Sequence, residues 1–149
     1  MKKIETKNKI INHIMANGSK KTSEKILFKT IKKIQKNSKK QLKQIIQLAI
    51  MNTTPTFKLH KIENKKQKKR NKKIREVPAF ISKEAYRTSI AIKFILSSIE
   101  KKKTKNFYKK LNQEIISTSE YKGNAIDLKN TLQKQVILKK HLFNYYRWK

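Results

Sequence analysis

The chain contains no cysteine and only two glycines, so it is poor in the residues around which many catalytic sites are built. Without cysteine, neither disulfide bonds nor thiolate metal sites can stabilise the fold. Gly18 and Gly123 belong to no phosphate-binding loop and no nucleophile elbow. His13, His60 and His141 stand far apart, without the spacing of metal ligands. We therefore expect no metal, no cofactor and no enzymatic activity.

Acidic residues are scarce as well, with 9 Asp and Glu against 40 Lys and Arg, which gives a formal net charge of +31. So few carboxylates, spread along the whole chain, provide no recognisable pair of general acid and general base. A chain with this charge repels itself when it becomes compact, and a hydrophobic fraction of 36% opposes that repulsion only weakly. We infer that the protein needs a polyanion, which a nucleic acid or an anionic membrane surface would provide.

Long apolar runs are missing too, since no segment approaches the roughly 18 residues that a transmembrane helix needs. The opening residues, MKKIETKNKIINHIM, contain no signal-like apolar block and no Arg- and Ser-rich presequence. The sequence thus predicts a protein that stays where it is synthesised or has already lost a presequence. Lysine outnumbers arginine 36 to 4, a bias typical of an AT-rich genome, so the four arginines are of special interest.

Helical periodicity dominates what is present. Aliphatic residues recur at i, i+3, i+4 and i+7, as on the buried faces of amphipathic helices. Asn17-Gly18 is expected to close the first helix. Ser38 with Gln41 is expected to form a capping box for the third, and Ser82 to cap the fourth. The apolar sets of the six expected helices fall within residues 10–15, 26–34, 42–50, 92–99, 107–115 and 128–136, with the fifth helix ending near Gly123 and Asn124 with Asp127 opening the sixth.

The helical period disappears between Pro55 and Pro78. Two short runs, TFKLHKI and REVPAFI, alternate apolar and polar residues on either side of a basic stretch, which predicts a β-hairpin over about residues 56–81. Arms of about ten residues at ~3.3 Å each would reach roughly 30 Å, and Pro78 fits only an edge position. We predict a mainly α protein: a single six-helix domain over residues 1–149, with a protruding two-stranded β-hairpin between helices 3 and 4.

The tip of this hairpin places eight cations in the eleven positions from Lys65 to Arg75. One interpretation is a disordered, solvated lysine tract. The other is an arm that neutralises phosphates and dominates affinity without reading sequence. Both can hold, if the tip is flexible alone and ordered on RNA. The residues are Lys65, Lys66, Lys68, Lys69, Arg70, Lys72, Lys73 and Arg75.

The C-terminus, HLFNYYRWK, gathers aromatic residues around Arg147. We interpret Phe143 as docking the last helix on the core. Arg147, Trp148 and Lys149 are expected to bind RNA, because aromatic planes between cations can stack on unpaired bases while the cations hold phosphates.

Several segments occur in a familiar order: NKIINHIMANGSKKTSEKILF, TTPTFKLHK, EVPAFI, AIKFIL and a terminal YYRWK. Together they resemble the small-ribosomal-subunit protein seven family, bacterial type, from about residue 7 to 149. The resemblance implies six helices with a hairpin between the third and fourth. It also implies early binding to the 3′ major (head) domain of small-subunit rRNA, contact with neighbouring small-subunit proteins, and a hairpin near exit-site tRNA and the mRNA exit path.

Some basic positions of that family can be carried over. Lys20, followed by Lys21, matches a lysine after the family's first helix. Arg87 and Lys93 fall at or beside basic positions opening the fourth helix, where Phe94 takes the place of a tryptophan. The terminal Arg-Trp pair is matched directly.

Other features depart from the family. Only about six residues precede the first helix, where the family has a basic arm, and the hairpin is longer and lacks a Gly-Gly pair. We hypothesise that the longer cationic tip takes over phosphate contacts. On the last helix, Lys134, Lys139 and Lys140 are the candidates for the family's basic stretch.

Two other classes of protein are alternatives to the interpretation as a ribosomal protein. An architectural DNA-binding protein would share the charge and the helices, but would need apolar wedges or a helix-turn-helix spacing. A membrane-surface protein would use the basic amphipathic helices, but the apolar faces are numerous enough to pack on each other. The enrichment in Lys, Ile and Asn and the short N-terminus predict a mitochondrially encoded protein, with a plastid-type organelle or an AT-rich bacterium as alternatives.

Overall fold

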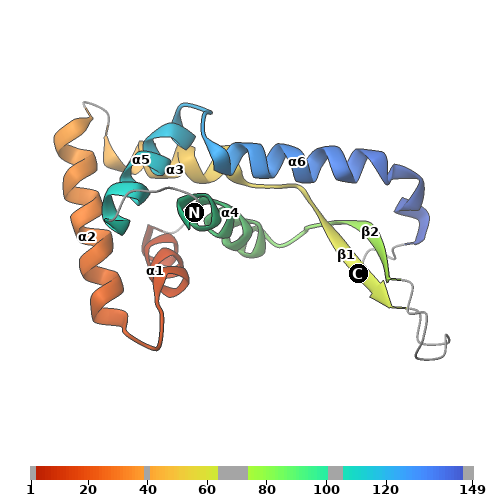
Figure 1. Ribbon diagram of the computed structural model, residues 1–149, viewed down its shortest axis with the longest axis horizontal. Coiled ribbons are helices and arrows are strands. Elements are labelled where there is room, and N and C mark those ends of the chain that lie inside the picture. The colour runs from red at the N-terminus through yellow and green to blue at the C-terminus, as the bar shows by residue number, and fades with distance from the viewer. Residues whose placement is uncertain (1–2, 39–40, 64–73, 101–105, 146–149) are drawn as a thin grey trace.

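The computed structural model describes residues 3–38, 41–63, 74–100 and 106–145 (Figure 1). Within these ranges the chain forms six α-helices and a two-stranded sheet between the third and fourth helices, which confirms the predicted fold class. The elements are α1 (Lys3–Ile14), α2 (Lys20–Asn37), α3 (Leu42–Thr53), β1 (Phe57–Glu63), β2 (Ile74–Phe80), α4 (Glu84–Glu100), α5 (Phe107–Ser119), α6 (Asn124–Leu138) and the 3₁₀ helix η1 (Lys140–Tyr145).

The molecule is elongated. Figure 1 shows α2 at one end of the long axis and the hairpin at the other, with α6 running from the helical body toward the hairpin. Within the described residues, no helix has the length and apolar character needed to cross a membrane.

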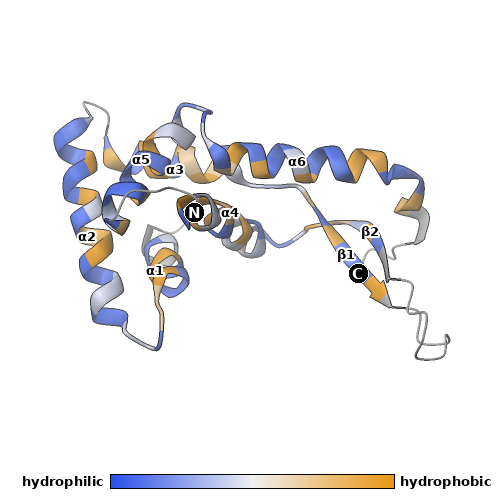
Figure 2. Ribbon diagram, viewed as in Figure 1, coloured by the Kyte–Doolittle hydropathy of each residue, from blue (hydrophilic) through white to orange (hydrophobic). Residues whose placement is uncertain are grey.

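Two clusters of buried aliphatic side chains hold the helical body together. The first joins α2, α4 and α5 through Ile34, Ile99 and Leu111, and the second joins α1 to α4 through Ile11 and Ile92. Figure 2 shows the corresponding alternation of hydrophobic and hydrophilic residues along the helices. Each such side chain stabilises the fold by about 1.5–3 kcal/mol relative to an exposed one. The predicted aliphatic stripes are therefore the core.

Two of the predicted helix starts are wrong. Ser38 lies just after α2, where its hydroxyl donates to the carbonyl oxygen of Ile34 at 2.7 Å, so it closes α2 and does not cap α3. The residue at the N-cap of α3 is Gln41, whose side chain makes no capping hydrogen bond. The fourth helix begins one residue later than predicted: the first helical N–H groups donate to the carbonyl oxygen of Lys83, and not to that of Ser82.

Glycine occupies the turn after α1 and the N-cap of α6, whereas α5 ends at Ser119, four residues before the Gly123 that was predicted to end it. The turn after α1 contains Asn17 at φ 50° and Gly18 at φ 72°, which confirms the predicted turn, although α1 itself ends at Ile14. Gly123, at φ 105° and ψ 164°, occupies the N-cap of α6. That helix begins at the predicted residue, but its cap comes from another helix, because the carboxylate of Glu114 on α5 accepts the N–H of Ala125 at 3.1 Å.

The hairpin is antiparallel, with a register that runs from Phe57 opposite Phe80 to Glu63 opposite Ile74. Pro78 stands opposite Leu59, a position that proline can occupy because both strands are edges. The inward residues Val77 and Ala79 are buried, which confirms that the base of the arm is a built structure.

The 3₁₀ helix η1 packs against this base. The ring of Phe143 meets that of Phe57 edge-on, with centroids 5.5 Å apart, and Phe57 meets Phe80 in the same way at 5.8 Å. Phe143 therefore packs against the rest of the protein, as predicted, but its partner is the hairpin and not the helical core.

Candidate nucleic-acid interface

The base of the hairpin meets α4 at two cation–aromatic contacts. The ammonium of Lys58 lies 4.9 Å from the centre of the Tyr86 ring, and the guanidinium of Arg87 lies 4.9 Å from the centre of the Phe80 ring. The two aromatic residues remain 46% and 42% exposed. An exposed ring beside a cation suits single-stranded RNA, because the ring stacks on a base while the cation contacts a phosphate. We call these four side chains the junction cluster.

Arg87 is also fixed by the fold. Its Nε donates to the carbonyl oxygen of Ile81 at 2.6 Å, so the guanidinium ties the end of the hairpin to the first turn of α4. Sequence reasoning named Arg87 but missed Lys58, Phe80 and Tyr86. A signal for Phe80 was available, because it alternates with the inward-facing residues of its strand and must face outward.

Lys93 lies on a different face of α4 from Arg87. The two residues are six positions apart, and at 3.6 residues per turn their side chains differ in direction by about two-thirds of a full rotation around the helix. Lys93 is exposed, and its charge acts on His13 of α1. Partial burial, and to a smaller extent the charge of Lys93, lower the pKa of His13. The structure therefore does not bring Arg87 and Lys93 together.

Lys20 and Lys21 are the first two residues of α2, and both are exposed. Cations oppose the positive end of a helix dipole, so this placement does not stabilise the helix. Together with the helix N-terminus, the two lysines form a surface that favours anions. It lies at the end of the molecule away from the hairpin, so these residues join no common site with the junction cluster (Figure 1).

The lysines of the last helix differ in what they contact. Lys134 and Lys140 are exposed. The ammonium of Lys139 instead pairs with the carboxylate of Glu76 at 2.5 Å, and this hydrogen bond and charge lower the pKa of Glu76. Lys129 donates to a backbone carbonyl oxygen of α3 at 2.7 Å, and burial lowers its pKa. Lys129 and Lys139 therefore support the fold, whereas Lys134 and Lys140 face solvent.

Two predicted sites lie largely outside the described residues. Arg75 belongs to β2 and pairs with Ile62, but its side chain is not described. The remaining residues of the hairpin tip and of the C-terminus stay predictions: Lys65, Lys66, Lys68, Lys69, Arg70, Lys72, Lys73, Arg147, Trp148 and Lys149.

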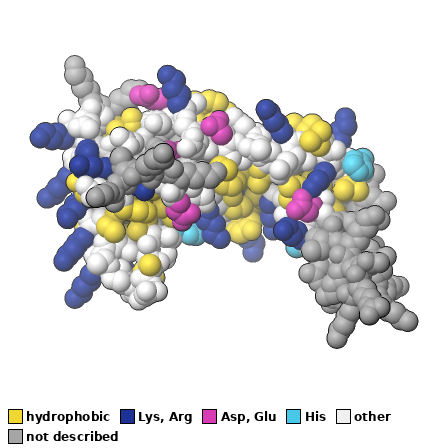
Figure 3. Space-filling model, in the orientation of Figure 1, with side chains coloured by type: hydrophobic (Ala, Val, Ile, Leu, Met, Phe, Trp, Pro, Cys, Tyr) yellow, Lys and Arg dark blue, Asp and Glu magenta, His cyan; other side chains and the backbone are white. Residues whose placement is uncertain are grey.

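Lysine and arginine side chains project around most of the described surface seen in Figure 3, with few carboxylates among them. They form their densest row along the edge that belongs to α2. A surface of this kind attracts polyanions over several ångströms.

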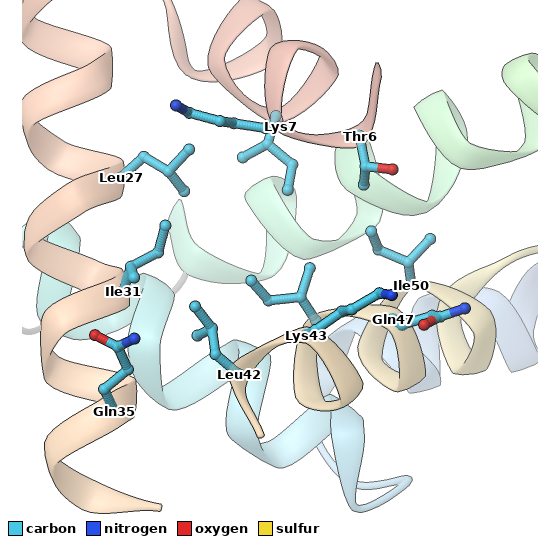
Figure 4. A pocket seen from close by; sticks show the side chains of 11 residues that line it. Thr6, Lys7, Leu27, Ile31, Gln35, Leu42, Lys43, Gln47 and Ile50 are labelled. Atoms are coloured by element: carbon cyan, nitrogen blue, oxygen red, sulfur yellow. The ribbon is translucent and has the colours of Figure 1, made fainter. Parts of the chain in front are cut away.

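A groove of about 640 Å³ lies between α1, α2 and α3 (Figure 4). Its floor is aliphatic, with Leu27, Ile31 and Ile50 turned toward it, and the charged residues among its described lining are Lys7 and Lys43. The described lining includes no carboxylate or histidine that could act as an acid or base. Among the described residues, no group of His, Asp and Glu is arranged to hold a metal ion.

A helical body with a basic surface and a built hairpin defines a scaffold protein of the kind that assembles with a polyanion. The family model for ribosomal protein S7p/S5e matches residues 2–140, so the chain belongs to this family. Small ribosomal subunit protein uS7c of Tetradesmus obliquus is 30% identical to it over 125 residues, which are 84% of this chain and 71% of that protein. The protein is thus a structural constituent of the small ribosomal subunit and not an enzyme.

Proposed function

We propose that the protein binds small-subunit rRNA directly and organises its 3′ major (head) domain, beside neighbouring small-subunit proteins. The observation that carries this proposal is the charge balance. Even if every carboxylate paired with a different cation, 9 acidic side chains could neutralise only 9 of the 40 basic ones. The remaining charge needs an external polyanion, and RNA offers one phosphate per nucleotide.

The mechanism is structural. Lysines neutralise phosphates and release counterions, which supplies affinity without reading sequence. Specificity comes from RNA shape, because the major groove of an A-form helix is too narrow for side chains to read. The junction cluster adds a second kind of contact, since its exposed rings can stack on unpaired bases. The hairpin would lie near exit-site tRNA and the mRNA exit path, as the family resemblance implies.

We place the protein in an organelle ribosome. The support is its composition, with 36 lysines against 4 arginines, as expected for a gene in an AT-rich organelle genome. Fractionation tests this assignment: the protein should sediment with the small ribosomal subunit from purified mitochondria. Sedimentation with plastid ribosomes would favour the alternative organelle.

The direct test is binding of the full chain to a transcript of the 3′ major domain at physiological salt. A transcript of equal length from another domain of the same rRNA serves as a control, and duplex DNA as a competitor. The proposal expects binding to the head transcript at least tenfold tighter than to the control, with little competition by DNA. Equal affinity for all three would refute it and favour the architectural DNA-binding class.

Deleting residues 64–73 tests the role of the hairpin tip, because it removes seven cations. If all of them contact phosphates, the slope of log K against log salt should fall by roughly 5 to 6. An unchanged slope would show that the tip does not bind phosphates, while binding of the remaining surface to the head transcript could persist.

A further inference from the structure

The outer face of α2 carries a row of lysines that the proposed head-domain contacts do not use. Lys25, Lys29, Lys32 and Lys36 are all exposed. At 3.6 residues per turn they fall within an arc of about 60°, and they extend along about 16 Å of helix. The buried residues of the same helix, among them Leu27 and Ile34, point the opposite way into the core. We call these four lysines the α2 row.

Codon bias alone does not account for this row. Helix α2 contains seven lysines in 18 residues, whereas α3 contains one in 12 and α4 one lysine and one arginine in 17. Burial explains the low lysine content of α3 and α4, but the more polar α5 and α6 also contain only two lysines each, in 13 and 15 residues. The concentration on α2 therefore indicates a local function.

The α2 row contains no carboxylate that could neutralise the charge of its four lysines. The single carboxylate of α2, Glu24, lies about a quarter turn from Lys25 and is not in the row. Lys33, which also lies outside the row, instead faces the ring of Tyr108 on α5 at 5.8 Å. Four like charges spaced three and four residues apart destabilise an isolated helix. An external anion would relieve this repulsion.

The chemistry of the row favours the backbone of duplex RNA. Lysine is a flexible point charge that binds phosphate without demanding a fixed geometry. The row itself consists of lysines alone and offers no aromatic plane on which an unpaired base could stack. Phe28, an exposed ring of the same helix, lies about 40° outside the arc of the row, beside Lys7 of α1. The row thus contacts phosphates alone, as the backbone of a double helix presents them.

The α2 row lies far from the hairpin. Figure 1 places α2 at one end of the long axis and the hairpin at the other, and the described residues of the two elements do not touch. Because the two elements lie at opposite ends of the molecule, one RNA segment at the hairpin end would leave the α2 row accessible. We propose that the α2 row binds a second, double-helical RNA segment, so that the protein bridges two separate parts of the RNA. This inference rests on the proposed function.

The test measures capture of a second RNA. The full-length protein is bound to an immobilised head-domain transcript, and a labelled RNA duplex of unrelated sequence is then added at physiological salt. Three variants are compared with the wild type. In the row variant Lys25, Lys29, Lys32 and Lys36 are changed to glutamine. In the control variant four exposed lysines of other elements, Lys43, Lys83, Lys109 and Lys122, are changed to glutamine. A third variant changes the α2 row to arginine.

We expect the wild type, the control variant and the arginine variant to capture the duplex. The row variant should lose at least tenfold in capture while its affinity for the head transcript changes less than threefold. Circular dichroism melting shows whether each variant is folded. Equal capture by the row and control variants would overturn the proposal. Preference of the wild-type row for polyglutamate over duplex RNA would also overturn it and would assign the row to an acidic protein.

The two proposals fail in different ways. If the wild type does not bind the head transcript in preference to the control transcript, the proposed function fails at the first step. If it binds the head transcript and captures no duplex, only the bridging proposal fails.

Discussion

Gly123 shows how one residue couples two helices. Its backbone angles, φ 105° and ψ 164°, lie in a region that is nearly restricted to glycine. A Cβ atom added there would stand 3.2 Å from Glu114 Oε1 and 3.3 Å from the Cβ of Ser117. The close approach lets the Glu114 carboxylate reach the N–H of Ala125 in the first turn of α6. Gly18 makes a useful comparison, because it has φ 72° and open space around its Cα.

We therefore expect Gly123→Ala to destabilise the protein by about 2–4 kcal/mol, and Gly18→Ala by about 1 kcal/mol. The first change adds a steric conflict to backbone strain, whereas the second adds strain alone. Urea unfolding at constant salt measures both free energies. Equal losses for the two variants would show that the contact with Glu114 does not constrain Gly123.

His13 reports on the charge of α4. Its pKa is lowered chiefly by partial burial and secondly by Lys93, so Lys93→Gln should raise this pKa without restoring the ordinary value of 6.5. Titration of the three histidines by NMR measures the shift, and Lys109→Gln serves as the control that leaves it unchanged. The unfolded chain binds this proton more readily, so protonation of His13 lowers stability as the pH falls below about 6.5. A pKa of His13 that does not respond to Lys93→Gln would contradict this account.

At the scale of elements, the ion pair between Lys139 and Glu76 joins the end of α6 to β2. The hydrogen bond from Lys139, and then its charge, lower the pKa of Glu76 below the ordinary value of 4.5. A carboxylate with a depressed pKa stabilises the fold above that ordinary value, and this contribution is lost as the pH falls through the folded pKa.

Glu76→Gln should therefore lower the melting temperature at pH 7, and the difference from the wild type should be smaller at a pH well below the ordinary value of 4.5. Glu120→Gln, which changes an exposed carboxylate, is the control and should have little effect at either pH. If the deficit of Glu76→Gln were the same at both pH values, the ion pair would not be what holds the hairpin to α6.

The elements themselves could be predicted from the sequence, because an amphipathic stripe depends only on residue spacing. The ends could not. Ser38 followed by Gln41 has the pattern of a capping box, yet its hydroxyl bonds backward to Ile34. The cap of α6 comes from Glu114, a residue ten positions before the helix, and local sequence does not show such a partner.

The nucleic-acid interface, like the helices, could be predicted from the sequence in general character but not in its particular contacts. The excess of lysine indicated a polyanionic partner. It did not distinguish the lysines that face solvent, where they can bind RNA, from the lysines that support the fold. Lys129 donates to a carbonyl of α3, and Lys139 pairs with a strand 63 residues away in sequence. These roles depend on which elements become neighbours. The same holds for the junction cluster, which brings β1, β2 and α4 together.

At the scale of the whole molecule, the net charge of +31 sets the conditions under which the fold is stable. Repulsion among surface cations opposes the compact state, and dissolved salt screens it, with a Debye length of about 10 Å at 0.1 M. We expect the melting temperature of the RNA-free protein to rise as KCl increases from 20 to 500 mM. A melting temperature that is constant or falls over this range would contradict the claim that self-repulsion limits stability.

The row and control variants of the capture experiment separate global from local effects of charge. Each lowers the formal net charge by four, so both should melt at a higher temperature than the wild type at 20 mM KCl and depend less on salt. The row variant also removes three pairs of like charges spaced three or four residues apart on α2, so it should be at least as stable as the control, and only the row variant should lose the second RNA. A row variant that is less stable than the control would mean that the α2 lysines support the helix itself. A row variant that melts higher than the control and loses capture would show that α2 gives up stability of the free protein for contact with RNA.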